Sequence, residues 1–341
     1  MYREPIVTAS ILDNSSTPDQ FSTDLDNPTL VNLRHLVCYQ VDGEDATTFL
    51  QGQFSNDITA VTSSNGQISS YCTPKGRMLA IFYICKRDDS YFLITSKDIA
   101  EEVMKRLQMY VMRSKVSIKF LDDSLLMGVC GNNHAEILTT LKLSTTKSHY
   151  QVNANESLIA MNIPSANPRY LIIGNPSTAQ QLKNLDISNV NIFDELYWQW
   201  LDIQSGIPSV TSNVQEAFVP QMANMELIDG VSFSKGCYPG QEIVARLHYL
   251  GNANRRMFRL SVEQNEPINI GDDIYTQGSE QPIGKFISVI SENEKKYTGL
   301  AVLRIEAVKK NQLAIGSASG NSAQIMPLPY DVPIELKEKQ K

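Results

Sequence analysis

The chain of 341 residues has few cysteines, and their number and spacing exclude several kinds of site. The five cysteines are odd in number, widely scattered and without a C-x-x-C pair, which argues against a disulfide framework or a zinc site. The closely spaced cysteine runs that hold iron–sulfur clusters are also missing. We therefore predict no metal bound by this chain alone.

Long apolar runs are absent as well. No stretch approaches the roughly 18 apolar residues needed to cross a bilayer. The amino terminus lacks a basic region followed by an apolar core, as a secretory signal would have. With 42% apolar residues the composition is that of an ordinary globular protein, and the length suggests two or three domains. We expect a cytoplasmic protein with no membrane partner.

The chain also has no excess of positive charge, because its net charge is −7. This argues against a protein that coats nucleic acid with its whole surface. The charge is uneven along the chain. Residues 1–30 hold one basic and five acidic residues, so we expect a flexible acidic tail. Residues 231–260 hold five basic residues and one acidic residue. This segment is either a site that attracts an anionic ligand or a solvated basic hairpin face.

The same basic segment contains the most informative motif, Lys-Gly-Cys-Tyr-Pro-Gly-Gln-Glu at residues 235–242. A glycine on each side of Cys237 allows positive φ angles and a close approach by another molecule, so we predict an exposed loop that presents a thiol. Lys235 and Arg246 are expected to favour the thiolate, because nearby positive charge lowers the pKa of a cysteine. The alternative is a small buried cysteine. The loop motif further comprises Gly236, Tyr238, Gly240, Gln241 and Glu242.

Apolar periodicity predicts an α+β protein made of two ferredoxin-like, split β-α-β halves followed by a small β-barrel. The first half, residues 31–123, should contain elements in the order β-α-β-β-β-α-β, with strands at 36–41, before and after a turn at 73–76, at 91–94 and at 115–120, and helices around 46–50 and 97–110. The second half, residues 124–250, should contain strands at 125–130 and 169–173, helices near 134–141 and around Ala179, a tryptophan-containing helix at 193–203 and the cysteine loop. Short strands predict the barrel over residues 251–330, ending in a strand at 328–330, and a mobile tail at 331–341.

Five motifs in this order resemble the folate-binding YgfZ family. They are FLQGQFSND at 49–57, KGR at 75–77, IQSGIP at 203–208, FVPQMANME at 218–226, and KGCYPGQE at 235–242 with VAR at 244–246. The resemblance covers about residues 35–330. It implies a fold similar to the glycine cleavage system T protein, a tetrahydrofolate site in a central cavity, and a role supporting iron–sulfur enzymes, including a tRNA-modifying radical enzyme as partner.

The resemblance also implies which residues bind the folate. Trp198 matches a folate-associated tryptophan and is expected either to stack on the ligand or to pack in the core. His35 stands where a relative has another tryptophan, so one wall of the pocket departs from the pattern. Gln221 and Asn224 have the amide groups that pterin recognition requires, or they bond the irregular backbone around them.

Two further cations complete the expected site. Lys75 and Arg77 lie on a tight turn and would either reach the folate carboxylates or a phosphate, or form a solvated hairpin tip. Both readings remain open from the sequence.

The residues, together with what the resemblance implies, leave three functions open. The first is a folate-dependent accessory protein for the assembly or repair of iron–sulfur enzymes, with Cys237 as the functional thiol. The second is a tetrahydrofolate-dependent aminomethyltransferase, which would leave the cysteine motif unexplained. The third is a non-catalytic module with direct tRNA contact, through Arg246, Arg255, Arg256 and Arg259. No reaction can be derived from the residues.

Overall fold

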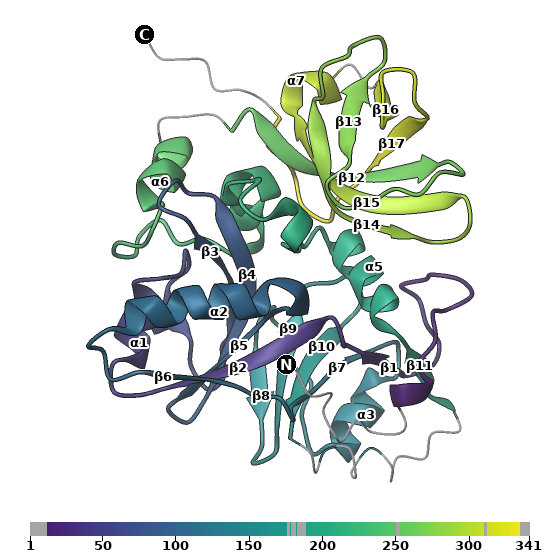
Figure 1. Ribbon diagram of the computed structural model, residues 1–341. Coiled ribbons are helices and arrows are strands. Elements are labelled where there is room, and N and C mark those ends of the chain that lie inside the picture. The colour runs from purple at the N-terminus through teal and green to yellow at the C-terminus, as the bar shows by residue number, and fades with distance from the viewer. Residues whose placement is uncertain are drawn as a thin grey trace. The chain divides into compact units, whose positions relative to one another are not determined.

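The computed structural model describes residues 12–175, 178, 182, 189–249, 253–309 and 312–334 (Figure 1). The chain divides into two compact units. Unit 1 comprises Met1–Gln53, Asp57–Ser69 and Phe82–Leu201, and unit 2 comprises Phe54–Asn56, Ser70–Ile81 and Asp202–Lys341. Unit 2 therefore draws two short segments from the first quarter of the chain.

A five-stranded sheet contains the first predicted half, with the order β3-β4-β5-β2-β6. Its elements are β2 (Leu36–Asp42), α1 (Ala46–Gln51), β3 (Gln67–Cys72), β4 (Met78–Arg87), β5 (Ser90–Ser96), α2 (Lys97–Val111) and β6 (Ser117–Phe120), and the short 3-10 helix η2 (Ile58–Ala60) follows α1. The predicted order β-α-β-β-β-α-β is confirmed. In α2, Ile99, Val103 and Leu107 are buried, whereas Tyr110, in the last turn of the helix, is 45% exposed.

A six-stranded sheet has the order β11-β1-β7-β10-β9-β8. Its elements are β1 (Thr29–Asn32), β7 (Leu125–Cys130), α3 (His134–Thr140), β8 (Val152–Ala154), β9 (Leu158–Ile163), β10 (Arg169–Gly174) and β11 (Asn191–Phe193). The sequence predicted β7, α3 and β10 but missed β8 and β9. Most of the predicted helix around Ala179 lies outside the described residues.

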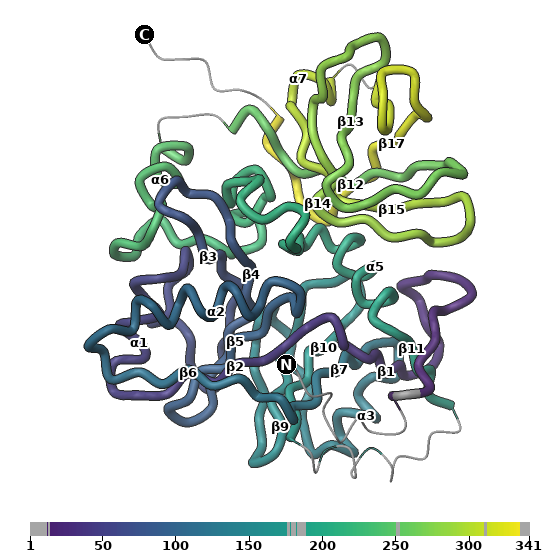
Figure 2. Tube along the Cα trace, viewed as in Figure 1, coloured from purple at the N-terminus to yellow at the C-terminus, as the bar shows by residue number. Residues whose placement is uncertain are grey.

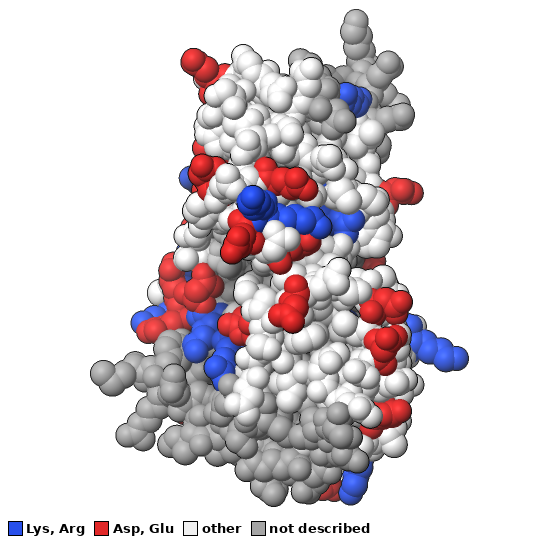
Figure 3. Space-filling model, turned by 90° about the vertical axis from the view of Figure 1, so that its right-hand side faces the viewer, with Lys and Arg blue, Asp and Glu red and all other residues white. Residues whose placement is uncertain are grey.

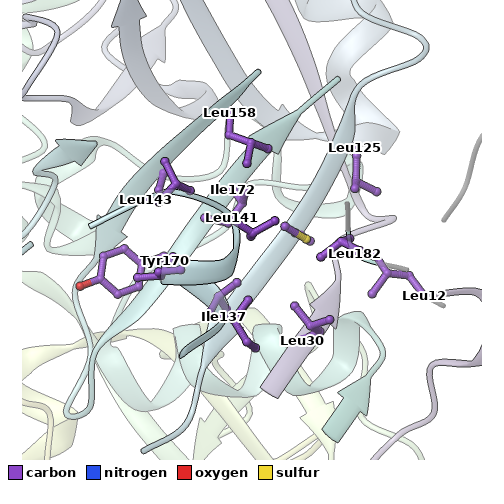
Figure 4. Close-up of a cluster of buried hydrophobic side chains, with 14 residues drawn as sticks. Leu12, Leu30, Leu125, Ile137, Leu141, Leu143, Leu158, Tyr170, Ile172 and Leu182 are labelled. Atoms are coloured by element: carbon purple, nitrogen blue, oxygen red, sulfur yellow. The ribbon is translucent and has the colours of Figure 1, made fainter. Parts of the chain in front are cut away.

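The strand β1 corrects the prediction for the amino-terminal region. It pairs with β7 antiparallel and with β11 in parallel, so the start of the chain completes the sheet of the second half. Leu12, in the short 3-10 helix η1 (Leu12–Asn14), lies in the same buried cluster as Leu30 and Leu182 (Figure 4). Residues 12–30 are therefore not simply a flexible tail, because their few apolar side chains are buried in a core.

The helix α5 (Glu195–Ser205) contains both tryptophans and covers most of the predicted span 193–203. An irregular stretch follows, with the short 3-10 helices η4 (Ser212–Val214), η5 (Pro220–Ala223) and η6 (Met225–Ile228), and leads through the cysteine loop into α6 (Gln241–Tyr249). Within the described residues, no helix has the length and apolar character that a membrane span requires.

The predicted carboxy-terminal β-barrel is confirmed. It is closed, with the order β12-β15-β14-β13-β16-β17, and has its own buried core. Its elements are β12 (Arg255–Glu263), β13 (Asp273–Thr276), β14 (Gly284–Ser291), β15 (Lys296–Arg304), α7 (Ile305–Val308), β16 (Leu313–Ile315) and β17 (Ser322–Met326). The predicted last strand at 328–330 is wrong. The Tyr330 hydroxyl instead donates a hydrogen bond to the Gly206 carbonyl at 2.7 Å, which fixes this segment beyond the barrel.

Candidate functional site

Cys237 is the only exposed cysteine of the five, all of which lie in described residues. Burial raises the pKa of the Cys72, Cys85 and Cys130 thiols to about 12, and it raises the pKa of Cys38 as well. These four are protonated at neutral pH and shielded from solvent. Chemistry at a cysteine of the folded protein is therefore directed to the loop before α6, and the exposed position predicted for Cys237 is what the structure shows.

Lys235 fixes the base of this loop. Its side chain is 8% exposed, and its ammonium donates hydrogen bonds to the carbonyl oxygens of Phe54 at 2.6 Å and Asn56 at 3.0 Å. The ammonium also lies 5.2 Å from the centroid of the Tyr238 ring, in a cation–π contact. A buried charge is tolerated only with such partners, so Lys235 joins the cysteine loop to the segment Phe54–Asn56, which is 180 residues away in sequence.

The segment Phe54–Asn56 makes further contacts with the chain that enters the loop. The Ser55 hydroxyl donates to the Gly230 carbonyl at 2.9 Å, and the Asn56 amide donates to the Asp229 carbonyl at 2.6 Å. The Ser232 amide donates back to the Ser55 carbonyl at 3.0 Å. The segment Phe54–Asn56 is thus bonded both to Lys235 of the cysteine loop and to the chain just before the loop, and the acceptor in each of these bonds is a backbone carbonyl.

A third motif, the turn that contains Lys75 and Arg77, packs against the other end of the loop. Gly240 has φ of +83°, and a Cβ there would lie 2.5 Å from both the Gly76 Cα and the Thr73 carbonyl oxygen. Gly76 has φ of +71° and faces Ile243 of α6. The tip of the β3–β4 hairpin accordingly lies beside α6 (Figure 2). Only a glycine at position 240 permits this backbone contact.

Gly236 does not have the same role. We expected positive φ at both glycines of the loop, but Gly236 is absent from the positive-φ residues, and a Cβ there would meet nothing within 4 Å. The space around Gly236 is open, next to the exposed Cys237. One glycine thus serves packing, and the other leaves room beside the thiol.

The two cations of the turn differ in their surroundings. The Arg77 guanidinium donates a hydrogen bond to the Ala217 carbonyl, and the adjacent Met78 amide donates to the Phe218 carbonyl at 2.8 Å. Lys75 is exposed. Arg246 is also exposed, on α6, where the ring of His248 stacks on Phe233 with centroids 3.6 Å apart.

Gln221 and Asn224 are both buried and bond to backbone. The Gln221 amide nitrogen donates to the Val244 carbonyl of α6 at 2.6 Å, and its Oε1 has no hydrogen-bond partner. Asn224, with φ of +57°, donates to the Met257 carbonyl of β12 at 2.8 Å. Asn224 thus holds η5 against β12 of the barrel. The side-chain carbonyl oxygen of Gln221, in contrast, accepts no hydrogen bond.

Trp198 lies in unit 1 and is fully buried. The guanidinium of Arg169 lies over its ring, 4.5 Å from the centroid. The strand β7 approaches the same ring so closely that a Cβ at Gly128 would lie 2.5 Å from two of its carbon atoms. The indole Nε1 has no hydrogen-bond partner. The sequence did not indicate Arg169, because nothing in the local pattern shows which strand lies beside the helix.

His35, also in unit 1, is partly buried at the start of β2. Burial lowers its pKa from the ordinary 6.5 to about 4, so the imidazole is neutral at pH 7. Its Nδ1 is buried and has no hydrogen-bond partner. Among the described residues, no group of three or more His, Cys, Asp or Glu side chains is arranged to hold a metal ion.

Two protein-family models match parts of the chain. Residues 26–160 match the model for the GCVT N-terminal domain, and residues 254–329 match the model for the CAF17 C-terminal β-barrel domain. The first match lies in the α+β part of the fold, and the second lies over the closed barrel.

Among curated proteins, the chain is similar to those named tRNA-modifying protein YgfZ. It is 27% identical to that of Sodalis glossinidius over 308 residues, which covers 89% of this chain and 93% of the relative. It is also 27% identical to that of Pectobacterium carotovorum subsp. carotovorum over 327 residues, covering 95% and 98%. The resemblance to the YgfZ family is confirmed.

A solved structure supports the fold. The glycine cleavage system aminomethyltransferase T from Bartonella henselae superposes with a TM-score of 0.71, covering 90% of this chain and 87% of that one. The sequence identity is 13%, so this similarity concerns the fold alone.

Proposed function

We propose that this protein binds a tetrahydrofolate and supports the assembly or repair of iron–sulfur enzymes, including enzymes that modify tRNA, with Cys237 as the functional thiol. The observation that carries the proposal is the construction of the cysteine loop. Lys235 and Gly240 fix its two ends to distant segments of the chain, while Cys237 between them remains exposed. A loop held this firmly presents its thiol in one position, which suits a group that acts on a partner.

The curated relatives support the RNA-related part of the proposal. They are named tRNA-modifying proteins, and they resemble this chain over most of its length. The neighbouring solved structure is named an aminomethyltransferase, but at 13% identity it does not favour that activity here. The cysteine motif would have no role in the aminomethyltransferase alternative.

Several residues suit the binding of a folate. A pterin edge needs donors and acceptors in a largely apolar setting. The Trp198 Nε1 is an unused buried donor in unit 1. The unused Nδ1 of the neutral His35 adds a further polar atom in unit 1. Bound folate would supply a carrier for one-carbon groups, and these residues would orient it.

The surroundings of Trp198 define its role more closely than the sequence did. Stacking of a pterin on the face of the indole that Arg169 covers would require the guanidinium to leave the ring. A hydrogen bond from Nε1 requires no such movement. We therefore propose Trp198 as a donor to the folate, with the Arg169 side chain keeping the ring in place.

Calorimetric titration with tetrahydrofolate tests the cofactor. The wild type should bind, and Trp198→Phe should bind roughly tenfold more weakly, because it keeps an aromatic ring but loses one buried donor. Trp200→Phe, the same substitution on the same helix, is the matched control and should bind like the wild type. Absence of binding by the wild type would remove folate from the proposal.

The thiol is tested separately in cells that lack the native protein. Cys237→Ser should fail to restore the activity of iron–sulfur enzymes, whereas Ser234→Ala, at an exposed neighbour in the same loop, should restore it. Both variants must accumulate to the level of the wild type. Full restoration by Cys237→Ser would show that the thiol is not the functional group.

A further inference from the structure

Two arginines lie side by side on adjacent strands of the barrel. Arg255 on β12 and Arg304 on β15 are direct partners in the antiparallel ladder. Side chains of such partners lie on the same face of the sheet with Cβ atoms about 5 Å apart, and like charges in this position destabilise the pair. The Arg255–Arg304 pair lowers the stability of the barrel, so folding stability does not explain why both positions hold an arginine.

A third guanidinium adds to this repulsion. Burial lowers the pKa of Arg255, and the positive charges of Arg304 and Arg77 lower it further. Arg77 is held on the hairpin turn by its bond to the Ala217 carbonyl, and all three arginines belong to unit 2. Arg255 therefore lies within electrostatic reach of two other positive charges, that of Arg304 and that of Arg77.

Two other arginines of the same strand have internal side-chain partners. Arg256 pairs with Glu226, and Arg259 donates to the Gln204 side chain. Within the described part of the chain, no ion pair with a carboxylate involves Arg77, Arg255 or Arg304. The basic segment at 231–260 is thus divided by the fold: Arg256 and Arg259 are used internally, and Arg255 is not.

We infer that Arg77, Arg255 and Arg304 form a site for a phosphate group of an RNA backbone. A guanidinium binds phosphate oxygens through two parallel hydrogen bonds, and several guanidinium groups around one anion convert their mutual repulsion into attraction. The arginine cluster does not include Cys237, Trp198 or His35, and for Arg77 it favours the phosphate over the folate carboxylates that the sequence left open.

The surroundings favour a linear polyanion over a small carboxylate ligand. Arg304 is exposed, and so are Lys75 on the same turn as Arg77 and Arg246 on the adjoining α6. Cations spread over neighbouring elements suit successive phosphates of one strand. The stacked Phe233 and His248, with the exposed Tyr249 beside them, offer aromatic faces on which an unpaired base can stack.

The overall surface charge does not supply such a site. On the face drawn in Figure 3, Lys and Arg side chains are interspersed with Asp and Glu side chains. With a net charge of −7, binding of RNA depends on a local group of cations such as the arginine cluster. The inference adds a contact for the tRNA-related partner of the proposed function, and it does not require folate binding.

The test is binding of fluorescent tRNA, followed by anisotropy over a range of salt concentrations. The double variant Arg255→Gln/Arg304→Gln should bind at least about tenfold more weakly, and the slope of log affinity against log salt should fall by about 2. Arg77 is left intact because its guanidinium also bonds Ala217. The matched control, Arg106→Gln/Arg113→Gln, removes the same charge from the region of α2 and should leave affinity and slope unchanged.

Two more measurements keep the result interpretable. The thermal midpoint of the double variant should not fall below that of the wild type, because a repulsion has been removed. Its affinity for tetrahydrofolate should be unchanged. Equal tRNA binding by wild type and double variant, equal losses in both double variants, or loss of folate binding in place of tRNA binding would overturn the inference. Failure of the wild type to bind folate would affect only the proposed function.

Discussion

At the scale of single residues, the environment of each side chain decides whether its chemistry is available. Cys237 is exposed, whereas the other four cysteines are buried with raised pKa values. Lys235 has the charge that could act on the thiol, but the fold uses its ammonium to bind two carbonyls. Trp198 has an aromatic face, but Arg169 covers it, and the indole nitrogen remains.

Selective modification of Cys237 follows from this difference. Treatment of the native protein with iodoacetamide at neutral pH should modify one thiol per chain, because only Cys237 is accessible. Mass spectrometry of the intact protein counts the adducts. In denaturant all five cysteines should react, and native Cys237→Ser should take up none. Modification of two or more thiols in the native protein would contradict the burial described here.

His35 predicts a pH dependence of stability. Its pKa is about 4 in the folded protein and 6.5 ordinarily, so the unfolded state binds the proton first as the pH falls. The free energy of unfolding should therefore be independent of His35 above pH 6.5 and decrease from there towards pH 4. Between pH 7 and pH 5 the loss is at most about 2 kcal/mol, and the exposed part of the ring reduces it.

Urea unfolding at the two pH values measures this loss. His35→Gln removes the titrating group and should lower the stability difference between pH 7 and pH 5 by the amount attributed to His35. Acidic residues contribute equally to both proteins, so the comparison isolates the histidine. The same pH dependence in both proteins would show that the imidazole is not buried in its neutral form.

At the scale of elements, three short motifs form the cysteine loop region together. The segment Phe54–Asn56 binds one end of the loop, the β3–β4 turn packs against the other end, and α6 continues from it. Most of these contacts involve backbone atoms. The three motifs therefore come together through backbone contacts as well as through their side chains. The contact at Gly240 leaves no room for a side chain, because a Cβ there would lie 2.5 Å from backbone atoms of the turn.

Substitution of the two loop glycines should have unequal effects. Gly240→Ala introduces a Cβ at positive φ and 2.5 Å from backbone atoms of the turn, and it should lower the free energy of unfolding by about 2 kcal/mol or more. Gly236→Ala is the control, since its Cβ meets open space, and it should change stability by no more than about 0.5 kcal/mol. Urea denaturation compares them. Similar effects of the two would show that the loop does not pack on the turn.

At the scale of the whole molecule, unit 2 is discontinuous in sequence. Its barrel closes on itself and has its own core, but the region between α5 and β12 depends on Phe54–Asn56 and Ser70–Ile81. Met78, for example, exchanges backbone hydrogen bonds with Glu216 and Phe218. The cysteine loop region is therefore assembled from segments between residues 54 and 81 and from the chain after residue 202.

A fragment of residues 202–341 tests this dependence. It keeps every barrel strand but lacks the carbonyls that Lys235 binds and the turn against which Gly240 packs. Limited trypsin digestion should cut it rapidly after Lys235 and Arg246, whereas Arg259 within β12 should stay protected. In the full chain, Lys235 should be protected. Equal protection of Lys235 in the fragment and the full chain would show that the loop forms without the distant segments.

The sequence by itself determined the order of the elements in the first half, the barrel and the exposed cysteine. These features depend on local properties: apolar periodicity within one segment, turn residues between segments, and glycines beside Cys237. The same local rules missed β8 and β9, which are short, and they assigned the final strand to 328–330 in place of β17.

Only the tertiary structure decided which distant residues meet. It placed β1 between β7 and β11, gave the Lys235 ammonium to the carbonyls of Phe54 and Asn56, and set Arg255 opposite Arg304. None of these contacts lies within reach of a local pattern, because each joins segments tens to hundreds of residues apart. They are decided by which arrangement buries the most apolar surface while satisfying backbone groups, and that is a property of the whole chain.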